Sequence, residues 1–310
     1  MEEAELRKAV EHSGYPLQTV VAGALADREY AVDEEWGWVD PDQDTERTLD
    51  IVAEWSSGYR HRSEQGEVVP IRSLLIECKQ SRNPYLGFSA VSPPSLDRHP
   101  VVVGLNRPKI TLFTENGDLI TSMSLIELLG LRGHHYLRAP VVVSSLSKAH
   151  PQGKRVEISG DEPFNSLIRP LTKASRRYRE HWFNPPAGNR NVHPVRLVFP
   201  VAVIDAPLIA VHGRQGRSDL KPVPWMRVIS RHAAGPGRQA RTKLGVEVVD
   251  LVAADYFENF LADQLDPFFD DFFYELTRIQ DVVLTGRGRV GGYEPGSPLP
   301  WDFREHLTAP

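Results

Sequence analysis

The spacing of apolar residues predicts a helix near the start of the chain, followed by extended segments. Apolar side chains recur at helical intervals between Pro16 and Ala26, and a proline is well tolerated in the first turn of a helix. Residues 28–32 and 36–39 are short and rich in apolar residues, and acidic turn residues separate them. We expect both of these segments to be extended.

Two longer apolar stretches are predicted to be neighbouring strands of a buried sheet. They cover residues 48–55 and 71–79, with a polar loop between them. The run Ser-Leu-Leu-Ile in the second stretch is too short and too apolar for a surface helix, which favours a strand covered on both faces. Residues 81–99 contain three prolines and are expected to form a loop. Short strands are predicted at residues 101–103 and 110–113, and a short helix at 124–129.

The second half of the chain predicts a helix, further strands and a helical C-terminal region. A helix is expected over residues 161–182, with its first aspartate as the cap. Residues 195–211 are strongly apolar and predict one long or two short strands, whereas residues 212–222 and 232–243 are polar and are expected to be loops. A helical hairpin or kinked helix is predicted over 255–284. The apolar face of this last segment carries Phe257, Phe260, Leu261, Leu265, Phe268, Phe269, Phe272 and Leu276.

Charge is distributed unevenly along the chain, whose net charge is −5. Residues 151–243 hold 17 Lys and Arg against 6 Asp and Glu, and the flanking parts are acidic. A basic middle segment suits a surface that faces phosphate groups, although a solvated, loop-rich region would have the same composition. Tyr178, Trp182 and Trp225 are interleaved with these cations and would either stack on bases or belong to the core. The predicted phosphate contacts on the 161–182 helix are Arg169, Lys173, Arg176 and Arg177.

Several classes of protein are excluded by composition and by missing motifs. Cys78 is the only cysteine, so the chain forms no internal disulfide and no cysteine-based zinc cluster. No apolar run approaches the roughly 20 residues that a membrane helix needs, and the acidic N-terminus does not resemble a secretory signal. We therefore expect a cytoplasmic protein without membrane association. Phosphate-binding Gly-x-x-x-x-Gly-Lys-Ser/Thr sequences are absent, which argues against energy-coupled translocation.

The candidate chemistry lies at the two predicted central strands. Glu77 and Lys79 are two residues apart, so they project to the same face of their strand. If the two strands pair, Asp50 reaches the same point. Two carboxylates can bind a hard cation such as Mg²⁺ and leave positions for water and phosphate oxygens. Such an ion activates water for an in-line displacement at phosphorus, and Lys79 would orient the water or stabilise the developing charge.

Alternative explanations exist for this pattern. A second match, Asp219-Leu-Lys221, follows Asp205 by 14 residues, but it comes after a Gly-, Arg- and Ser-rich stretch with no apolar strand to hold it. We interpret it as a coincidence. Glu77 and Lys79 would also be explained by an ion pair at a strand end, although burying such a pair costs desolvation free energy for little net gain.

A helix that begins Gly14-Tyr-Pro-Leu-Gln18, a strand that carries Asp50 and a strand that ends in Glu77-Cys-Lys79 follow one another in this order. This order resembles the PD-(D/E)XK restriction-endonuclease-like superfamily over residues 14–88. The resemblance implies an α/β fold with a restriction-endonuclease-like mixed central sheet flanked by helices. It also implies a nuclease-like core in residues 1–150. Residues 151–310 would be a basic α/β extension that ends in the Phe-rich helices and packs on or completes this core.

The resemblance also implies roles for individual residues. Asp50 and Glu77 would be metal ligands together with the backbone carbonyl of Cys78, and Lys79 would be the catalytic lysine. Gln18 stands where many members carry a glutamate that supports the metal, and it could coordinate only through a neutral oxygen. Gln80 either contacts a phosphate or faces solvent. Leu49 replaces the proline of the family motif, a variation that the superfamily often shows.

These observations predict a nuclease that depends on Mg²⁺, or on Mn²⁺ as an alternative. Its substrate would be nucleic acid, with DNA favoured, in defence or DNA processing. The alternative is a nuclease-like scaffold that holds nucleic acid or a protein partner without cutting it. In either case the Phe-rich C-terminal helices would belong to the core, or a surplus of apolar surface on them would dock to a partner or form a homodimer.

Overall fold

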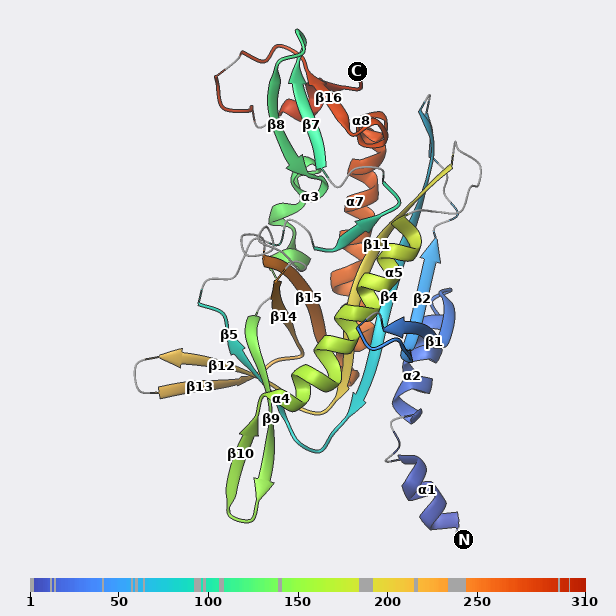
Figure 1. Ribbon diagram of the computed structural model, residues 1–310, viewed down its shortest axis with the longest axis vertical. Coiled ribbons are helices and arrows are strands. Elements are labelled where there is room, and N and C mark those ends of the chain that lie inside the picture. The colour runs from blue at the N-terminus through green and yellow to red at the C-terminus, as the bar shows by residue number, and fades with distance from the viewer. Residues whose placement is uncertain are drawn as a thin grey trace.

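The computed structural model of the chain describes most of its length. It covers residues 3–310 except 12, 14, 41, 57, 59–60, 64, 92–95, 97–98, 106–108, 139–140, 184–191, 215–216, 234–243, 295 and 301. A 13-stranded mixed sheet forms the centre, and a four-stranded sheet lies beside the last helices (Figure 1). The predicted α/β class is confirmed.

The strands of the large sheet come from both halves of the chain. In their spatial order they are β1 (Ala31–Asp40), β2 (Thr45–Ser56), β4 (Gly66–Gln80), β11 (Val192–Asp205), β15 (Leu244–Ala253), β14 (Trp225–Ala233), β9 (Val142–Gln152), β5 (Tyr85–Ser89), β12 (Leu208–Arg214) and β13 (Arg217–Pro222). Three short strands pair at the sides: β3 (His61–Ser63) with β4, β6 (Val101–Val103) with β11, and β10 (Arg155–Ser159) with β9. The small sheet has the order β17 (Leu307–Thr308), β16 (Arg287–Val290), β7 (Lys109–Thr114) and β8 (Leu119–Ser124).

Helices connect and cover these sheets. They are α1 (Glu3–Glu11), α2 (Tyr15–Ala26), α3 (Leu125–Leu128), α4 (Asp161–Pro163), α5 (Arg169–Phe183), α6 (Phe257–Phe260), α7 (Asp266–Arg278) and α8 (Gln280–Thr285). Two π-helical segments, Phe164–Ile168 and Leu261–Leu265, lie directly before α5 and α7. Short 3₁₀ helices occur at Leu131–Gly133, His135–Arg138, Ala254–Tyr256 and Phe303–His306. In Figure 1, α5 crosses in front of β4 and β11.

Four strands make the part of the sheet that matters for the site. β1, β2 and β4 are antiparallel neighbours, and β11 runs parallel to β4 over 14 residue pairs, from Val192 opposite Glu67 to Asp205 opposite Gln80. Because β11 comes from residues beyond 150, the second half of the chain contributes a long strand to the same sheet as β4.

The strong apolarity of β4 has the predicted cause, because both of its faces are covered. Leu74 and Ile76 pack in one core cluster with Leu25 of α2, and Leu75 packs in a second cluster with Leu171 of α5. Since neighbouring side chains on a strand point to opposite faces, a strand between two helical layers needs apolar residues at consecutive positions.

The helical C-terminal region is confirmed, and its apolar face lies inside this chain. All eight large residues predicted there are buried, and they belong to the same core cluster as α2 and the centre of β4. The helices bend through the π-helical segment Leu261–Leu265. These eight side chains therefore offer no surface to a partner, and the homodimer stays a prediction.

Two segments expected to be loops contain strands. Residues 212–222 were expected to be a loop, but β12 and β13 form an antiparallel hairpin there, with His212 opposite Asp219. Residues 81–99 were also expected to be a loop, but β5 lies between parallel β12 and antiparallel β9. β5 is held by backbone pairing with β9 and β12, which are distant in sequence, and β13 is held by pairing with β12. The local hydrophobic pattern encodes neither pairing. The predicted 232–243 loop lies mostly outside the described residues.

Candidate active site

The structure brings the three predicted residues Asp50, Glu77 and Lys79 together. Ile51 and Ile76 form the last pair of the antiparallel register of β2 and β4, and Asp50 and Glu77, the next residue of each strand, are close enough to interact electrostatically. Asp50 Oδ2 accepts a hydrogen bond from the backbone N–H of Cys78 at 2.6 Å. Lys79 Nζ donates to Glu77 Oε1 at 2.5 Å. Two carboxylates and one ammonium group therefore share one place on the two central strands.

A local irregularity surrounds Asp50. Leu49 and Val52 pack in the same core cluster although they are three residues apart, so the usual alternation is interrupted between them. On the paired strand β1, Glu35 has a left-handed backbone with φ 55° and lies between the pairs Glu34–Ile51 and Trp36–Leu49. An interruption of this kind changes the direction of neighbouring side chains.

Glu35 is the functional candidate that the sequence analysis missed. The sequence predicts acidic turn residues here, but Glu35 is exposed within β1 and its carboxylate contributes to the raised pKa of both Asp50 and Glu77. One feature of the sequence could have indicated Glu35. It lies between two predicted extended segments, and these form one strand in the structure. Its proximity to Asp50 depends on the β1–β2 register, which the sequence alone did not give.

Burial dominates the electrostatics of the site. The pKa of Glu77 is raised to about 7, mainly by burial, with Lys79 opposing the rise and the charge of Asp50 adding to it. Burial also raises the pKa of Asp50, partly offset by the Cys78 N–H and by Lys79. Although desolvation disfavours its charge, Lys79 has a raised pKa because of Glu77 and Asp50. Lys79 therefore stays a cation. The two buried carboxylates need a nearby positive charge, because burial makes their ionisation costly.

The two predicted supporting glutamines make other contacts. Gln18 of α2 is buried, and its Nε2 donates to the backbone carbonyl of Asp50 at 3.1 Å. It therefore helps to fix β2. Gln80 is exposed, and its Nε2 donates to Asp205 Oδ2 at 2.8 Å, at the matching end of β11. At Cys78, the backbone N–H makes the contact with Asp50.

The donor set suits Mg²⁺ chemically, because this ion keeps several waters and often needs only one or two protein carboxylates. Within the described part of the chain, no group of three or more His, Cys, Asp or Glu side chains is placed to hold a metal ion. Asp50 and Glu77 would be the protein ligands. Each currently has one oxygen engaged by a protein donor, Cys78 N–H or Lys79 Nζ.

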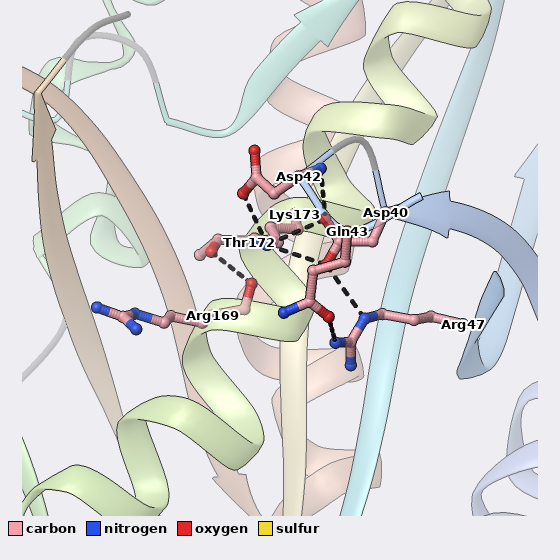
Figure 2. A network of polar contacts seen from close by, with 7 residues as sticks. All are labelled: Asp40, Asp42, Gln43, Arg47, Arg169, Thr172 and Lys173. Atoms are coloured by element: carbon pink, nitrogen blue, oxygen red, sulfur yellow. Dashed lines mark hydrogen bonds and ion pairs between the residues drawn. The ribbon is translucent and has the colours of Figure 1, made fainter. Parts of the chain in front are cut away.

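Three of the four cations predicted to contact phosphate on α5 have carboxylate partners. Lys173 bridges Asp40 and Asp42 of the β1–β2 hairpin, at 2.9 and 2.8 Å, as Figure 2 shows. Arg176 pairs with Glu247, and Arg177 with Glu180.

Asp40 is almost fully buried and also pairs with Arg47 Nε at 3.1 Å. The Arg169 side chain points away from this network (Figure 2). Its guanidinium lies 5.4 Å from the ring of Phe164. Among the described residues it has no carboxylate partner. Arg169 is therefore the cation of this helix best placed to meet a phosphate.

A second polar cluster is buried on the other side of the sheet. Arg227 donates to both oxygens of Asp250, at 2.7 and 3.1 Å, and Asp250 also accepts from the Tyr136 hydroxyl at 2.7 Å. His99 Nε2 lies 2.8 Å from the same hydroxyl. All four residues are buried, and they join β14 and β15 to the 3₁₀ helix His135–Arg138 and to the loop that contains His99. We assign this cluster to the stability of the sheet.

Comparisons of the chain with family models, with curated proteins and with solved structures found no match. In the described residues, no helix is long and apolar enough to cross a membrane.

Proposed function

We propose that this chain is a metal-dependent nuclease that hydrolyses phosphodiester bonds, with DNA as the favoured substrate. The observation that carries the proposal is the hydrogen bond from Cys78 N–H to Asp50, which fixes one carboxylate against the strand of Glu77 and Lys79. The mixed sheet between α2 and α5 supports it as well, because the resemblance implies a sheet of that kind flanked by helices.

In this mechanism Asp50 and Glu77 hold the cation, and Mg²⁺ or Mn²⁺ supplies an activated water and charge neutralisation when bound. Glu77 has to lose both its proton and its contact with Lys79 to act as a ligand, since burial raises its pKa to about 7. The released Lys79 ammonium then donates to a phosphate oxygen or orients the attacking water. Arg169 would contact the backbone of the nucleic acid.

Cleavage assays test the proposal directly. Labelled single-stranded and double-stranded DNA would be incubated with Mg²⁺ or Mn²⁺ and the intact protein, then with Glu77→Gln and Lys79→Met. We expect each substitution to reduce cleavage at least about 100-fold, the scale of a lost catalytic group. A double variant at the second motif, Asp219→Asn with Lys221→Met, is the matched control and should cut normally. Undiminished cleavage by both site variants would rule out the site.

A nuclease-like scaffold that binds without cutting is the second candidate. The Lys79–Glu77 ion pair favours it, because a site that never binds metal still needs a cation to balance a buried carboxylate. Calorimetric titration with Mn²⁺ separates the two. The nuclease should show binding that disappears in Glu77→Gln, whereas the scaffold should show no difference between the two proteins.

A further inference from the structure

An aromatic groove of about 600 Å³ lies beside the candidate site, between β1–β2 and the second half of α5. We call it the β1–α5 groove. Trp36, Trp38, Tyr178 and Trp182 line it, and Glu54 of β2 is part of the lining. A cavity of this size and composition is suited to a small organic ligand or to part of a larger one, because such sites combine aromatic walls with a few polar groups.

The aromatic walls keep surface available for stacking. The ring centroids of Trp36 and Tyr178 are 5.9 Å apart, and those of Tyr178 and Trp182 are 6.3 Å apart, both in edge-to-face geometry. Tyr178 is buried, whereas Trp36 and Trp182 are only partly buried. One face of Trp182 is covered by the Arg196 guanidinium, 3.5 Å from its ring centroid. A flat, electron-poor ring would find partly exposed indoles on two walls.

Glu54 gives the groove a hydrogen-bond acceptor. Its Oε1 accepts from the Tyr178 hydroxyl, from Arg196 Nε at 3.2 Å and from Ser73 Oγ at 3.2 Å. Among the described residues, Oε2 receives no hydrogen bond, and 30% of the side chain is exposed. A ligand that presents an N–H group would donate the hydrogen bond that Oε2 lacks among the described residues. Flat rings with N–H donors are the chemistry of nucleobases.

The groove and the candidate site are neighbours on the β1–β2 ladder. Trp36 pairs with Leu49, the residue before Asp50, and follows Glu35 in β1. Arg177 and His181 also line the groove and are exposed. Arg177 can meet a phosphate that flanks a bound base when it leaves its exposed ion pair with Glu180. Because Trp36 lies opposite Leu49, we expect the sugar–phosphate backbone of a base in the groove to run towards Asp50.

We propose that the β1–α5 groove binds an unpaired nucleobase of the substrate. The inference rests on the proposed nuclease function and adds its substrate class: single-stranded nucleic acid, or a duplex with an unpaired end. A base within a duplex is stacked on both faces and paired along its edge, so it has to leave the helix before it can enter such a groove.

Binding measurements on a protein that does not cut can test this. We would use Glu77→Gln without metal and measure fluorescence anisotropy with a labelled 12-nucleotide single strand and with a blunt hairpin of the same composition. We expect the single strand to bind at least about tenfold more tightly. Trp36→Leu should weaken its binding by about tenfold, the scale of one lost base stack, and Trp36→Phe should restore most of it. Tyr274→Leu removes an exposed aromatic on α7, 65% exposed, and should have no effect.

A second measurement does not depend on the variants being folded. Titration of the intact protein with mononucleotides should quench tryptophan fluorescence in a saturable way. Equal affinity for single strand and hairpin, together with unchanged binding by a folded Trp36→Leu, would overturn the groove proposal. If the protein cuts duplex DNA and Trp36→Leu changes neither binding nor cleavage, the groove proposal alone fails. If Trp36-dependent binding is present without any cleavage, the nuclease proposal alone fails.

Discussion

Asp50 Oδ2 and the backbone N–H of Cys78 are joined by a 2.6 Å hydrogen bond, although 28 residues separate them in the chain. This bond links the strand that carries one acid to the strand that carries Glu77 and Lys79. Asp50 therefore has two separable roles, as an acceptor for a buried N–H group and as a negative charge for a cation.

Substitutions at Asp50 should separate these roles. Asp50→Ala leaves the Cys78 N–H without an acceptor, and we expect it to lower the free energy of unfolding by about 1–3 kcal/mol. Asp50→Asn keeps an oxygen that can accept this bond, so it should lose much less stability. Both variants should lose metal-dependent cleavage, because neither has the charge. Urea denaturation and cleavage assays measure the two effects. Equal destabilisation by both variants, or cleavage retained by Asp50→Asn, would contradict this separation of roles.

Glu35 should strengthen cation binding without being required for the fold. Its exposed carboxylate acts on Asp50 and Glu77, and a charge at the surface contributes about 1 kcal/mol to such an interaction. Glu35→Gln should therefore weaken Mn²⁺ binding about fivefold in calorimetric titrations. Glu29 is the matched control, since it is also a glutamate with a left-handed backbone, φ 63°, but is not a source of the pKa shift of Asp50 or Glu77. An equal effect of Glu29→Gln would show that Glu35 has no specific role.

The meeting of Asp50, Glu77 and Lys79 could be predicted because short-range rules determine it. Alternation on one strand places Glu77 and Lys79 on one face, and a short connection favours pairing with the strand of Asp50. Glu35 could not be found this way. Its contribution depends on a left-handed residue inside a strand, and the acidic run around it is typical of a turn.

Long-range contacts account for the other differences. Helical spacing correctly placed Lys173 among the cations of one helix, but it gave no indication that Asp40 and Asp42 lie across from it. At β13 the long-range contact is indirect. Its residues 218–222 are exposed, and it is a strand because it pairs with the adjacent β12, which itself pairs with the distant β5. Trp36 was assigned to an extended segment, but its groove is completed by α5, more than 130 residues later.

Lys173 and Arg169 should behave differently although both are cations of α5. Lys173→Met removes an ammonium group from the buried Asp40, and we expect it to lower the free energy of unfolding by about 1–3 kcal/mol. Arg169→Met should leave stability nearly unchanged and weaken DNA binding, with a smaller dependence of affinity on salt. Thermal unfolding and binding at two salt concentrations measure both. A stable Lys173→Met protein with weakened DNA binding would instead make Lys173 a phosphate contact.

His99 should make the protein less stable in mild acid. Burial, with a further contribution from Arg227, lowers its pKa from 6.5 to about 4. Between these values the unfolded chain binds a proton that the native histidine does not, so the free energy of unfolding falls with decreasing pH, by at most about 1.4 kcal/mol per pH unit.

Glu77 changes the free energy of unfolding in the opposite direction. From about pH 7 to 4.5 its native carboxyl keeps a proton that the unfolded chain releases, so its contribution to stability rises as pH decreases.

Single variants separate these two contributions to the pH dependence. His99→Gln keeps a polar contact for the Tyr136 hydroxyl but does not titrate, so the stability of the intact protein relative to this variant should fall as pH decreases from 6.5 to 4. The same difference for Glu77→Gln should rise as pH decreases from 7 to 4.5. Urea denaturation at half-unit pH intervals gives both curves. If the difference in free energy of unfolding between the intact protein and His99→Gln does not change with pH over this window, the native histidine takes up its proton as readily as the unfolded one.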